Sequence, residues 1–419
     1  MSKKLITFAA ALLAVVSCTS VKTDHAKWTY DSVVYEVNVR QFSPEGTFNA
    51  VKAEVPRLKE LGVDILWLMP IYPIGEAERK GSLGSYYAVR DYKDVNPMFG
   101  TMEDFESLLA EVHKEGLRLI LDWVPNHTAP DHAWITEHPD YYKLDSLGRP
   151  TFDADWNDTR TLNYANPEVR KAMDDGLRFW LKKGVDGFRC DMAGMVPTDY
   201  WEWQIPSIRK DYPECYWLAE AETPDLSDPV KTFDATYSWE LHHLLNDVAQ
   251  GKKTADDIKA YIEKDAKNTP ANAFRLMFTS NHDENSWAGT EFERMGDAAG
   301  VMAVLCFTLP KGQPLIYTGQ EVGFDHRFLF FEKDPIESWE PNEYTEFYQL
   351  LTILKHNHKA LAAGEAGAPA EWLEGYPEGV LAFKRSLPDD TVTVVANLTP
   401  DEVVLPDGVP MEGWGYVID

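Results

Sequence analysis

The stretch "GVDGFRCDMAGM", residues 184–195, decides the fold class because it ends a short apolar run with two charged side chains. Arg189 closes the run, and Asp191 follows two positions later. Residues i and i+2 of a strand share a face, so both side chains are expected to point the same way. The arginine would keep the aspartate ionised and fix its direction. A purely structural ion pair is the alternative, and this stretch alone does not separate the two.

Eight apolar runs of this kind recur along the chain. They are "SVVYEVNV" (32–39), "VDILWLM" (63–69), "LRLILDWV" (117–124), "GVDGFRC" (184–190), "CYWLAE" (215–220), "TFDATY" (232–237), "FRLMFTS" (274–280) and "QPLIYTG" (313–319). Stretches of helical period lie between them, for example residues 101–116 and 166–184. This alternation predicts a parallel sheet, and eight runs favour a (β/α)8 barrel over an open doubly wound sheet.

Two segments depart from the alternation. About forty irregular residues follow the third run, which predicts a short inserted domain over 127–164. It would separate barrel segments 28–126 and 165–365. From residue 370 to 419 the pattern becomes that of antiparallel strands joined by turns. The predicted fold is therefore α/β, a (β/α)8 TIM barrel with a short inserted domain after strand 3 and a small C-terminal antiparallel β domain.

Composition excludes several functional classes. The 419 residues include 68 acidic and 40 basic side chains, a formal charge of -28, which argues against a nucleic-acid partner. The 14 Trp, 19 Tyr and 19 Phe fit core packing first and a sugar-stacking surface second. Cys190, Cys215 and Cys306 are too widely spaced for a disulfide framework or a zinc site, so we expect them in the core.

The first 18 residues, "MSKKLITFAAALLAVVSC", predict a targeting segment. A positive start precedes an apolar run that is too short for a membrane span. Cys18 resembles the lipidated residue of a bacterial lipoprotein, and Thr19 after it resembles outer-membrane sorting. We expect an exported protein held at the outer membrane by its lipid anchor only. A plain secretory signal is the alternative, and the periplasmic or surface face stays open.

Polar residues gather where the predicted strands end, which is where barrels of this type form active sites. These residues are Asp122, Asn126 and His127 after the third run, Arg189 and Asp191 after the fourth, Glu220 after the fifth, and Asn281, His282 and Asp283 after the seventh. A helix cap explains one carboxylate but not four on one rim. The spacing of the histidines does not favour a catalytic metal. Glycoside hydrolysis needs one ionised carboxylate and one acid, and Asp191 and Glu220 fit these parts.

Motifs in the same places resemble those of the alpha-amylase family of glycoside hydrolases. The matching segments are "DWVPNH" (122–127), "GFRCD" (187–191), "LAEAE" (218–222), "SNHD" (280–283), "GQPLIYTGQE" (312–321) and "YYAVRDY" (86–92). They follow the family's order and cover nearly the whole chain after the targeting segment. The resemblance implies the barrel, an alpha-glucan substrate and no cofactor for the chemistry.

The resemblance also implies a role for each site residue. Asp191 would be the nucleophile, Glu220 the general acid and then the base, Asp283 the ligand of the sugar hydroxyls, Arg189 the residue that orients Asp191, His127 and His282 hydrogen-bonding partners of the sugar, Tyr87 the stacking ring, and Asp122 a support for the rim. Glu222 is the alternative acid, two residues further on. A nucleophile and an acid together imply net retention at the anomeric carbon.

The chain departs from the family pattern in two places. "MAGM" (192–195) replaces the Lys-His that often follows the second motif, which puts acceptor-side affinity and transfer activity in doubt. It also removes a backbone ligand of the family's structural calcium, although Asn126 and the acidic inserted segment leave such a calcium open. Ser85 and Tyr86 stand where a histidine usually precedes the stacking tyrosine.

These observations predict retaining hydrolysis of alpha-1,4-glucosidic bonds in starch-type glucans or maltodextrins. The alternatives are a glucosidase or neopullulanase active on maltooligosaccharides or pullulan, or a glucanotransferase. A non-catalytic glucan-binding protein is a further alternative, but it would be expected to lack one of Asp191, Glu220 and Asp283.

Overall fold

The protein is described here from a computed structural model that covers residues 25–419. The predicted targeting segment, including Cys18, lies outside the described residues. Within residues 25–419, no helix combines the length and the apolar character needed to cross a lipid bilayer.

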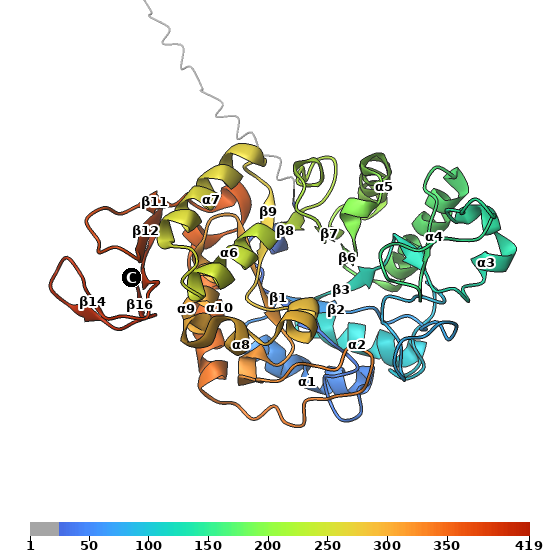
Figure 1. Ribbon diagram of the computed structural model, residues 1–419, viewed down its shortest axis with the longest axis horizontal. Helices are drawn as coiled ribbons and strands as arrows, with labels where there is room; N and C mark the ends of the chain where they lie inside the picture. The colour runs from blue at the N-terminus through green and yellow to red at the C-terminus, as the bar shows by residue number, and fades with distance from the viewer. Residues whose placement is uncertain (1–24) are drawn as a thin grey trace, which may run out of the picture.

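The eight predicted runs form the eight strands of one closed parallel barrel, so the predicted fold class is confirmed (Figure 1). The strands are β1 (Val34–Val37), β2 (Ile65–Leu68), β3 (Arg118–Trp123), β6 (Gly187–Cys190), β7 (Tyr216–Ala219), β8 (Ala235–Tyr237), β9 (Phe274–Met277) and β10 (Gly312–Tyr317). Their order around the barrel is β1-β10-β9-β8-β7-β6-β3-β2. Neighbours in the chain are thus neighbours in the barrel, as parallel strands joined by helical crossovers require.

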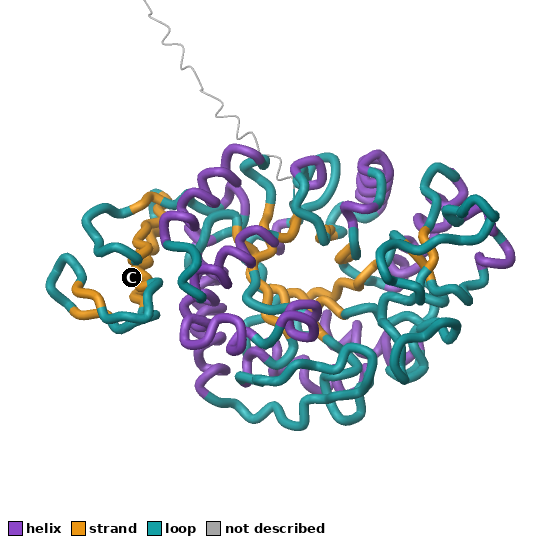
Figure 2. Tube along the Cα trace, viewed as in Figure 1, coloured by secondary structure: helices purple, strands orange, loops and turns teal. Residues whose placement is uncertain are grey.

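Helices surround the barrel (Figure 2). They are α1 (Phe48–Glu60), α2 (Met102–Lys114), α4 (Pro167–Lys183), α5 (Thr198–Asp211), α6 (Trp239–Ala249), α7 (Ala255–Asn268), α8 (Glu291–Met295), α9 (Ala299–Thr308) and α10 (Glu343–Asn357). Asn166 caps α4 by accepting from the Glu168 amide at 3.0 Å. Gly184 ends α4 in the left-handed region, at φ 102°, where glycine has no steric penalty.

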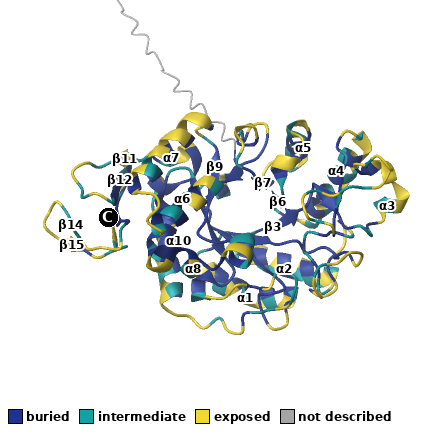
Figure 3. Cartoon of the chain, in the orientation of Figure 1, coloured by how far each residue is buried: buried dark blue, intermediate teal, exposed yellow. Residues whose placement is uncertain are grey.

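Alternation along the strands sends one side chain into the barrel and the next toward the helices. Val34, Ile65, Trp67, Ile120 and Leu218 belong to the cluster that fills the barrel. Cys190, Cys215 and Cys306 are buried in the layer between barrel and helices, as predicted. The strands are the most buried part of the molecule (Figure 3). The same alternation places Glu36, Asp122 and Arg189 inside the barrel near its carboxyl end.

Two smaller parts flank the barrel at opposite ends of the view in Figure 1. Between β3 and α4 lie a two-stranded pair, β4 (His127–Thr128) with β5 (Arg160–Thr161), and the short helix α3 (Trp134–Glu137). At the other end is an antiparallel sheet in the order β11-β12-β13-β16, with the small pair β14-β15 beside it. Its bounds are β11 (Glu371–Trp372), β12 (Val380–Leu387), β13 (Asp390–Asn397), β14 (Val403–Val404), β15 (Pro410–Met411) and β16 (Tyr416–Ile418).

Buried Arg385 joins this sheet to the barrel, and buried Lys355 joins α10 to β10. Arg385 of β12 is fully buried and donates to backbone carbonyls at the end of α9, Thr308 at 2.9 Å and Leu309 at 3.0 Å. Lys355 of α10 is also buried and donates to the Gly312 carbonyl at 2.8 Å. Burial lowers the pKa of Arg385 to about 9. Both cations are bound by carbonyl dipoles at the end of a helix or strand.

Candidate active site

A cavity of about 560 Å³ opens at the carboxyl ends of the barrel strands. Of the residues predicted for the site, Tyr87, His127, Asp191, Glu220, His282 and Asp283 line it. The structure thus brings together side chains that are separated by up to about two hundred positions in the chain. Asp122 and Arg189 are buried next to this group and bonded to it.

Arg189 is the centre of the site. Its Nη1 donates to both carboxylate oxygens of Asp122, at 3.0 and 3.1 Å, and to Asp191 Oδ1 at 3.1 Å. Its Nη2 forms an ion pair with Glu220 Oε2 at 3.0 Å. One fully buried guanidinium therefore contacts three carboxylates, and the predicted contact with Asp191 is only one of them.

Arg189 lowers the pKa of Asp191, as expected, but other influences oppose it. Burial raises the pKa of Asp191 well above its usual range, the charge of Glu220 raises it further, and Arg189 offsets only part of this. Burial likewise raises the pKa of Asp122 to about 6, against the opposing effect of Arg189. The pKa of Asp283 is raised too, mainly by burial. One cation shared among several carboxylates in a poorly solvated site cannot stabilise full ionisation of each.

Glu220 and Glu222 occupy different places. Glu220 follows β7, lines the cavity, and accepts a hydrogen bond from the Met192 amide at 2.7 Å. Met192 has φ 45°, a left-handed conformation that is uncommon outside glycine, and this turn presents its N–H to Glu220. Glu222 instead accepts from the Glu240 amide at 2.7 Å, at the start of α6. The first carboxylate after the strand is therefore the one that shares the cavity with Asp191.

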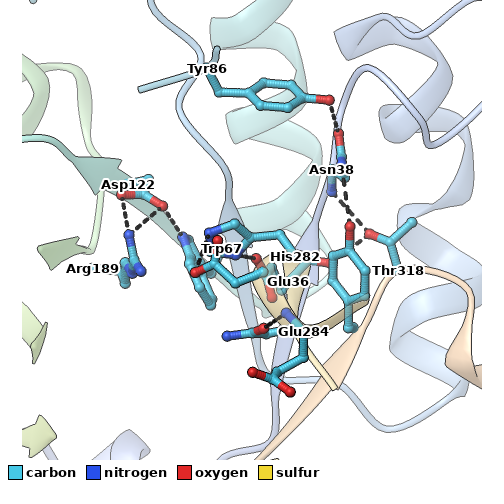
Figure 4. A network of polar contacts seen from close by, with 12 residues as sticks. Glu36, Asn38, Trp67, Tyr86, Asp122, Arg189, His282, Glu284 and Thr318 are labelled. Atoms are coloured by element: carbon cyan, nitrogen blue, oxygen red, sulfur yellow. Dashed lines mark hydrogen bonds and ion pairs between the residues drawn. The ribbon is translucent and has the colours of Figure 1, made fainter. Parts of the chain in front are cut away.

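A hydrogen-bonded chain runs beside these carboxylates, and Figure 4 labels four of its members, Arg189, Asp122, His282 and Glu36. The Tyr87 hydroxyl donates to Asp122 Oδ2 at 3.1 Å and lies 2.7 Å from His282 Nε2. The other ring nitrogen of His282, Nδ1, lies 2.5 Å from Glu36 Oε1. Sequence reasoning missed Glu36, although a single carboxylate inside the apolar run 32–39, in register with inward-facing Val34, is the signal that could have found it.

His127 meets the cavity from the inserted segment. It is 3% exposed, and burial lowers its pKa to about 4, so the imidazole is neutral near pH 7. The Trp156 ring lies 6.0 Å from the His127 ring and also lines the cavity. A neutral imidazole and an indole at one edge can bind an uncharged, polar ring.

An aromatic wall, formed by Trp287, Phe330 and Phe331, lines the cavity on the side of Tyr87. Trp287 lies on a π-helical turn, Glu284–Ala288, and is 58% exposed, which is unusual for a tryptophan. Its ring centre is 5.3 Å from Phe330 and 5.8 Å from Phe331, and Phe330 stacks on Tyr87 at 6.4 Å. Sequence reasoning missed these residues because they lie outside the recognised motifs, on a short π-helical turn and in a loop.

Asn126, the residue that left a calcium site open in the sequence, is hydrogen-bonded within the inserted segment. Asn126 Nδ2 donates to Asp153 Oδ2 at 3.1 Å, and Thr161 Oγ1 donates to the same oxygen at 2.9 Å. In the described part of the chain, no three or more His, Cys, Asp or Glu side chains are grouped to hold a metal ion. Calcium requires six to eight oxygen ligands, and here the candidate oxygen is bonded to two protein donors.

Comparison with known proteins agrees with this geometry. The family model "Alpha amylase, catalytic domain" matches residues 20–160 and 152–349. Alpha-amylase MalA of Haloarcula japonica is 30% identical over 404 residues, with 92% of this chain and 58% of that protein covered. A probable oligo-1,6-glucosidase of Bacillus subtilis is 27% identical, covering 72% of this chain and 66% of the relative.

A solved structure resembles the whole fold. An alpha-amylase from Lactobacillus plantarum superimposes with a TM-score of 0.82 at 29% identity, covering 93% of this chain and 99% of that one. The chain spans little more than half the length of the Haloarcula relative but nearly all of this structure. With the barrel, the ordered motifs and a family model that matches most of the sequence, the chain belongs to the alpha-amylase family of glycoside hydrolases.

Proposed function

We propose that this chain is a retaining hydrolase of alpha-1,4-glucosidic bonds in starch-type glucans or maltodextrins. One observation carries the proposal. Asp191, Glu220 and Asp283 face a single cavity, and Arg189 contacts two of the three. Family membership alone does not choose among the family's substrates, so the assignment depends on this site.

The proposed reaction proceeds in two steps. Asp191 attacks the anomeric carbon while Glu220 donates its proton to the glycosidic oxygen, which leaves with the departing sugar. Glu220, now ionised, then removes a proton from water, and the hydroxide oxygen displaces Asp191. The Met192 amide donates to Glu220 Oε2 at 2.7 Å and so fixes the direction of this carboxyl group.

The remaining site residues are proposed to hold the sugar. Asp283 and His282 would bind hydroxyls of the reacting ring, Tyr87 would stack against its face, and neutral His127 would donate from the opposite edge. Tyr87 and His282 are fixed before substrate arrives, because the Tyr87 hydroxyl is bonded to both Asp122 and His282. Such preorganisation favours the transition state over the ground state.

The aromatic wall of Trp287, Phe330 and Phe331 favours a chain of several sugars over a disaccharide. Glucan rings present flat apolar faces that stack on exposed aromatic rings. The relatives include an alpha-amylase and an oligo-1,6-glucosidase by name, so maltooligosaccharide- or pullulan-active hydrolysis and glucosyl transfer are the alternatives within the family.

A product time course tests the proposal. Protein lacking residues 1–22 is given amylose, maltotriose or pullulan, with Asp191→Asn as the inactive control and Asp175→Asn as a matched exposed control. Mixed oligosaccharides early from amylose support the endo-acting hydrolase. Glucose or maltose alone, or panose from pullulan, would move the assignment to the oligosaccharide-active alternative.

The Asp191→Asn control separates catalysis from mere binding. We expect turnover to fall about a thousandfold or more, with thermal stability retained, because the nucleophile is lost and the side-chain volume is not. If the wild type binds maltoheptaose without releasing products, and Asp191→Asn binds equally well, the chain is a glucan-binding protein.

We also propose that the protein is exported and anchored through Cys18. The proposal rests on the sequence of residues 1–19 alone. Radiolabelled palmitate should enter the full-length protein in a bacterial host and should not enter Cys18→Ala. Label in both proteins, or in neither, would contradict the anchor.

A further inference from the structure

Glu36 is a buried carboxylate that the proposed mechanism does not use. It lies on β1 inside the barrel and is fully buried. Its Oε1 is 2.5 Å from His282 Nδ1, and its Oε2 has no hydrogen-bonding partner among the described residues. An ionised carboxylate in such a place is costly unless it is paired with a cation.

The hydrogen-bonded chain fixes where the protons of His282 lie. Asp122 accepts from Arg189 and from Trp67 Nε1 at 3.2 Å, and the Tyr87 hydroxyl also donates to it. Because the Tyr87 proton is directed to Asp122, its oxygen is left to accept from His282 Nε2, 2.7 Å away. Nδ1 faces the acceptor Glu36, so both ring nitrogens face acceptors and both carry hydrogen.

We propose that Glu36 is a positioning residue that keeps His282 doubly protonated, so that the charged ring, whose Nε2 is bonded to Tyr87, holds Asp283 ionised as an acceptor at the sugar-binding edge. The charge of His282 can act on Asp283 because His282 Nε2 lies 3.4 Å from Asp283 Oδ2. Substrate hydroxyls would then meet an ionised acceptor, Asp283, beside the cationic ring. This inference deepens the proposed function and rests on it.

The charges around His282 act in both directions. Burial raises the pKa of Glu36, and the charge of His282 and its hydrogen bond to Glu36 oppose that rise. Burial lowers the pKa of His282, but the charges of Asp283 and Glu36 and the bond to Glu36 raise it to about 9, with Arg189 opposing them. The charge of Asp122 on β3 also interacts with the His282 ring. The Tyr87 hydroxyl is the polar neighbour of that ring at Nε2. Conversely, His282 is the largest influence that lowers the pKa of Asp283.

The test compares Glu36→Gln with Glu321→Gln. Glu321 is also fully buried, but it binds Tyr35 and Arg57 and does not line the cavity. Protein labelled with ¹³C at histidine Cε1 is titrated by NMR, and the His282 signal is assigned by its absence in His282→Gln. The pH profiles of kcat and kcat/KM for maltohexaose are measured on the same proteins.

In the wild type we expect the His282 signal to stay that of an imidazolium at pH 7 and to titrate near pH 9. In Glu36→Gln the midpoint should fall by about one pH unit or more, because an anionic neighbour is lost. The alkaline limb of kcat/KM should move to lower pH, and kcat should fall about tenfold. Glu321→Gln should change stability without moving either limb.

A neutral His282 in the wild type at pH 7 would overturn the inference, and this result needs no folded variant. Unchanged His282 titration and kinetics in Glu36→Gln would overturn it as well. Wild-type protein that carries a charged His282 but hydrolyses no glucan would instead contradict the proposed function and leave the Glu36 contact standing.

Discussion

Asp122 and Arg189 lie directly opposite one another on β3 and β6, and Arg189 Nη1 donates to both oxygens of Asp122. Both side chains are fully buried. This cross-strand pair, rather than the pair of Arg189 with Asp191 along the strand, fixes the guanidinium. Asp191 and Glu220 are then positioned by an arginine that is already held.

Asp122→Asn should therefore weaken the fold and the site together. Removing one partner of a buried ion pair leaves the other charge poorly compensated, at a cost of about 3 kcal/mol in the free energy of unfolding. Turnover should fall as well, because Arg189 loses its anchor. Urea denaturation and initial rates on amylose measure both effects, and wild-type values for both would contradict the anchoring role.

The acid limb of activity should lie above the ordinary range of an aspartate. Burial and the charge of Glu220 raise the pKa of Asp191, and only its ionised form can act as the nucleophile. Activity is therefore lost, as pH falls, at a higher pH than for an exposed aspartate.

The Glu220→Gln variant separates the effect of burial on the pKa of Asp191 from the effect of the Glu220 charge. With alpha-maltosyl fluoride, whose leaving group needs no acid, the variant should form the covalent intermediate, with an acid limb shifted to lower pH because one negative charge is gone. Pre-steady-state fluoride release against pH measures this. An acid limb that does not move would mean that burial alone sets the titration of Asp191.

Trp287→Ala should weaken binding of long substrates. The exposed indole lies in the aromatic wall beside Tyr87, and loss of one stacking ring should raise KM for maltoheptaose about tenfold. Maltotriose, which spans fewer sites, should be affected less. Trp203→Ala is a matched control, since Trp203 is also exposed but does not line the cavity. Equal loss for both sugars would place Trp287 at the reacting ring instead.

Chelation should leave thermal stability unchanged. Asn126 Nδ2 donates to Asp153, and no group of three or more His, Cys, Asp or Glu side chains that could hold a metal ion occurs in residues 25–419. Calorimetry with EDTA and with added calcium should give the same unfolding midpoint. A calcium-dependent rise would mean that the Asn126 amide rotates to offer its oxygen.

Lys355 should make stability rise with pH. Burial and the charge of Arg385 lower its pKa to about 7, so between pH 7 and about 10 the unfolded chain binds more protons than the folded one. Stability then increases with pH, by up to about 1.4 kcal/mol per unit from this group.

The comparison is between the wild type, Lys355→Met and Lys359→Met. Lys359 has a mostly exposed side chain and serves as the matched control. Urea unfolding at pH 7, 8 and 9 should show a smaller rise in Lys355→Met than in the other two proteins. Parallel slopes in all three would assign the pH dependence to other groups.

The barrel could be predicted from the sequence because every strand is an apolar run long enough to stand out, with a helical pattern after most of them. Asp191, Glu220 and Asp283 could be found because strand ends converge on one rim of a barrel. The choice between Glu220 and Glu222 required the structure, since it depends on which carboxylate turns toward Met192.

Other features could not be predicted from the sequence, because they join residues far apart in the chain. The bond between Arg189 and Asp122 joins residues 67 positions apart and depends on strand register. Glu36 lies within an apolar run, and nothing in that run indicates that its hydrogen-bonding partner is His282, 246 positions away. Trp287 and Phe330 lie in separate loops, and only the closed barrel brings them side by side.

Through Arg385, the C-terminal sheet also stabilises the barrel. Its guanidinium donates hydrogen bonds to the Thr308 and Leu309 carbonyls, where α9 ends. Cutting the chain before β11 would remove this donor from both carbonyls. We therefore expect the barrel and the sheet to unfold together. A transplanted form of this barrel should therefore include the C-terminal sheet, residues 371–419.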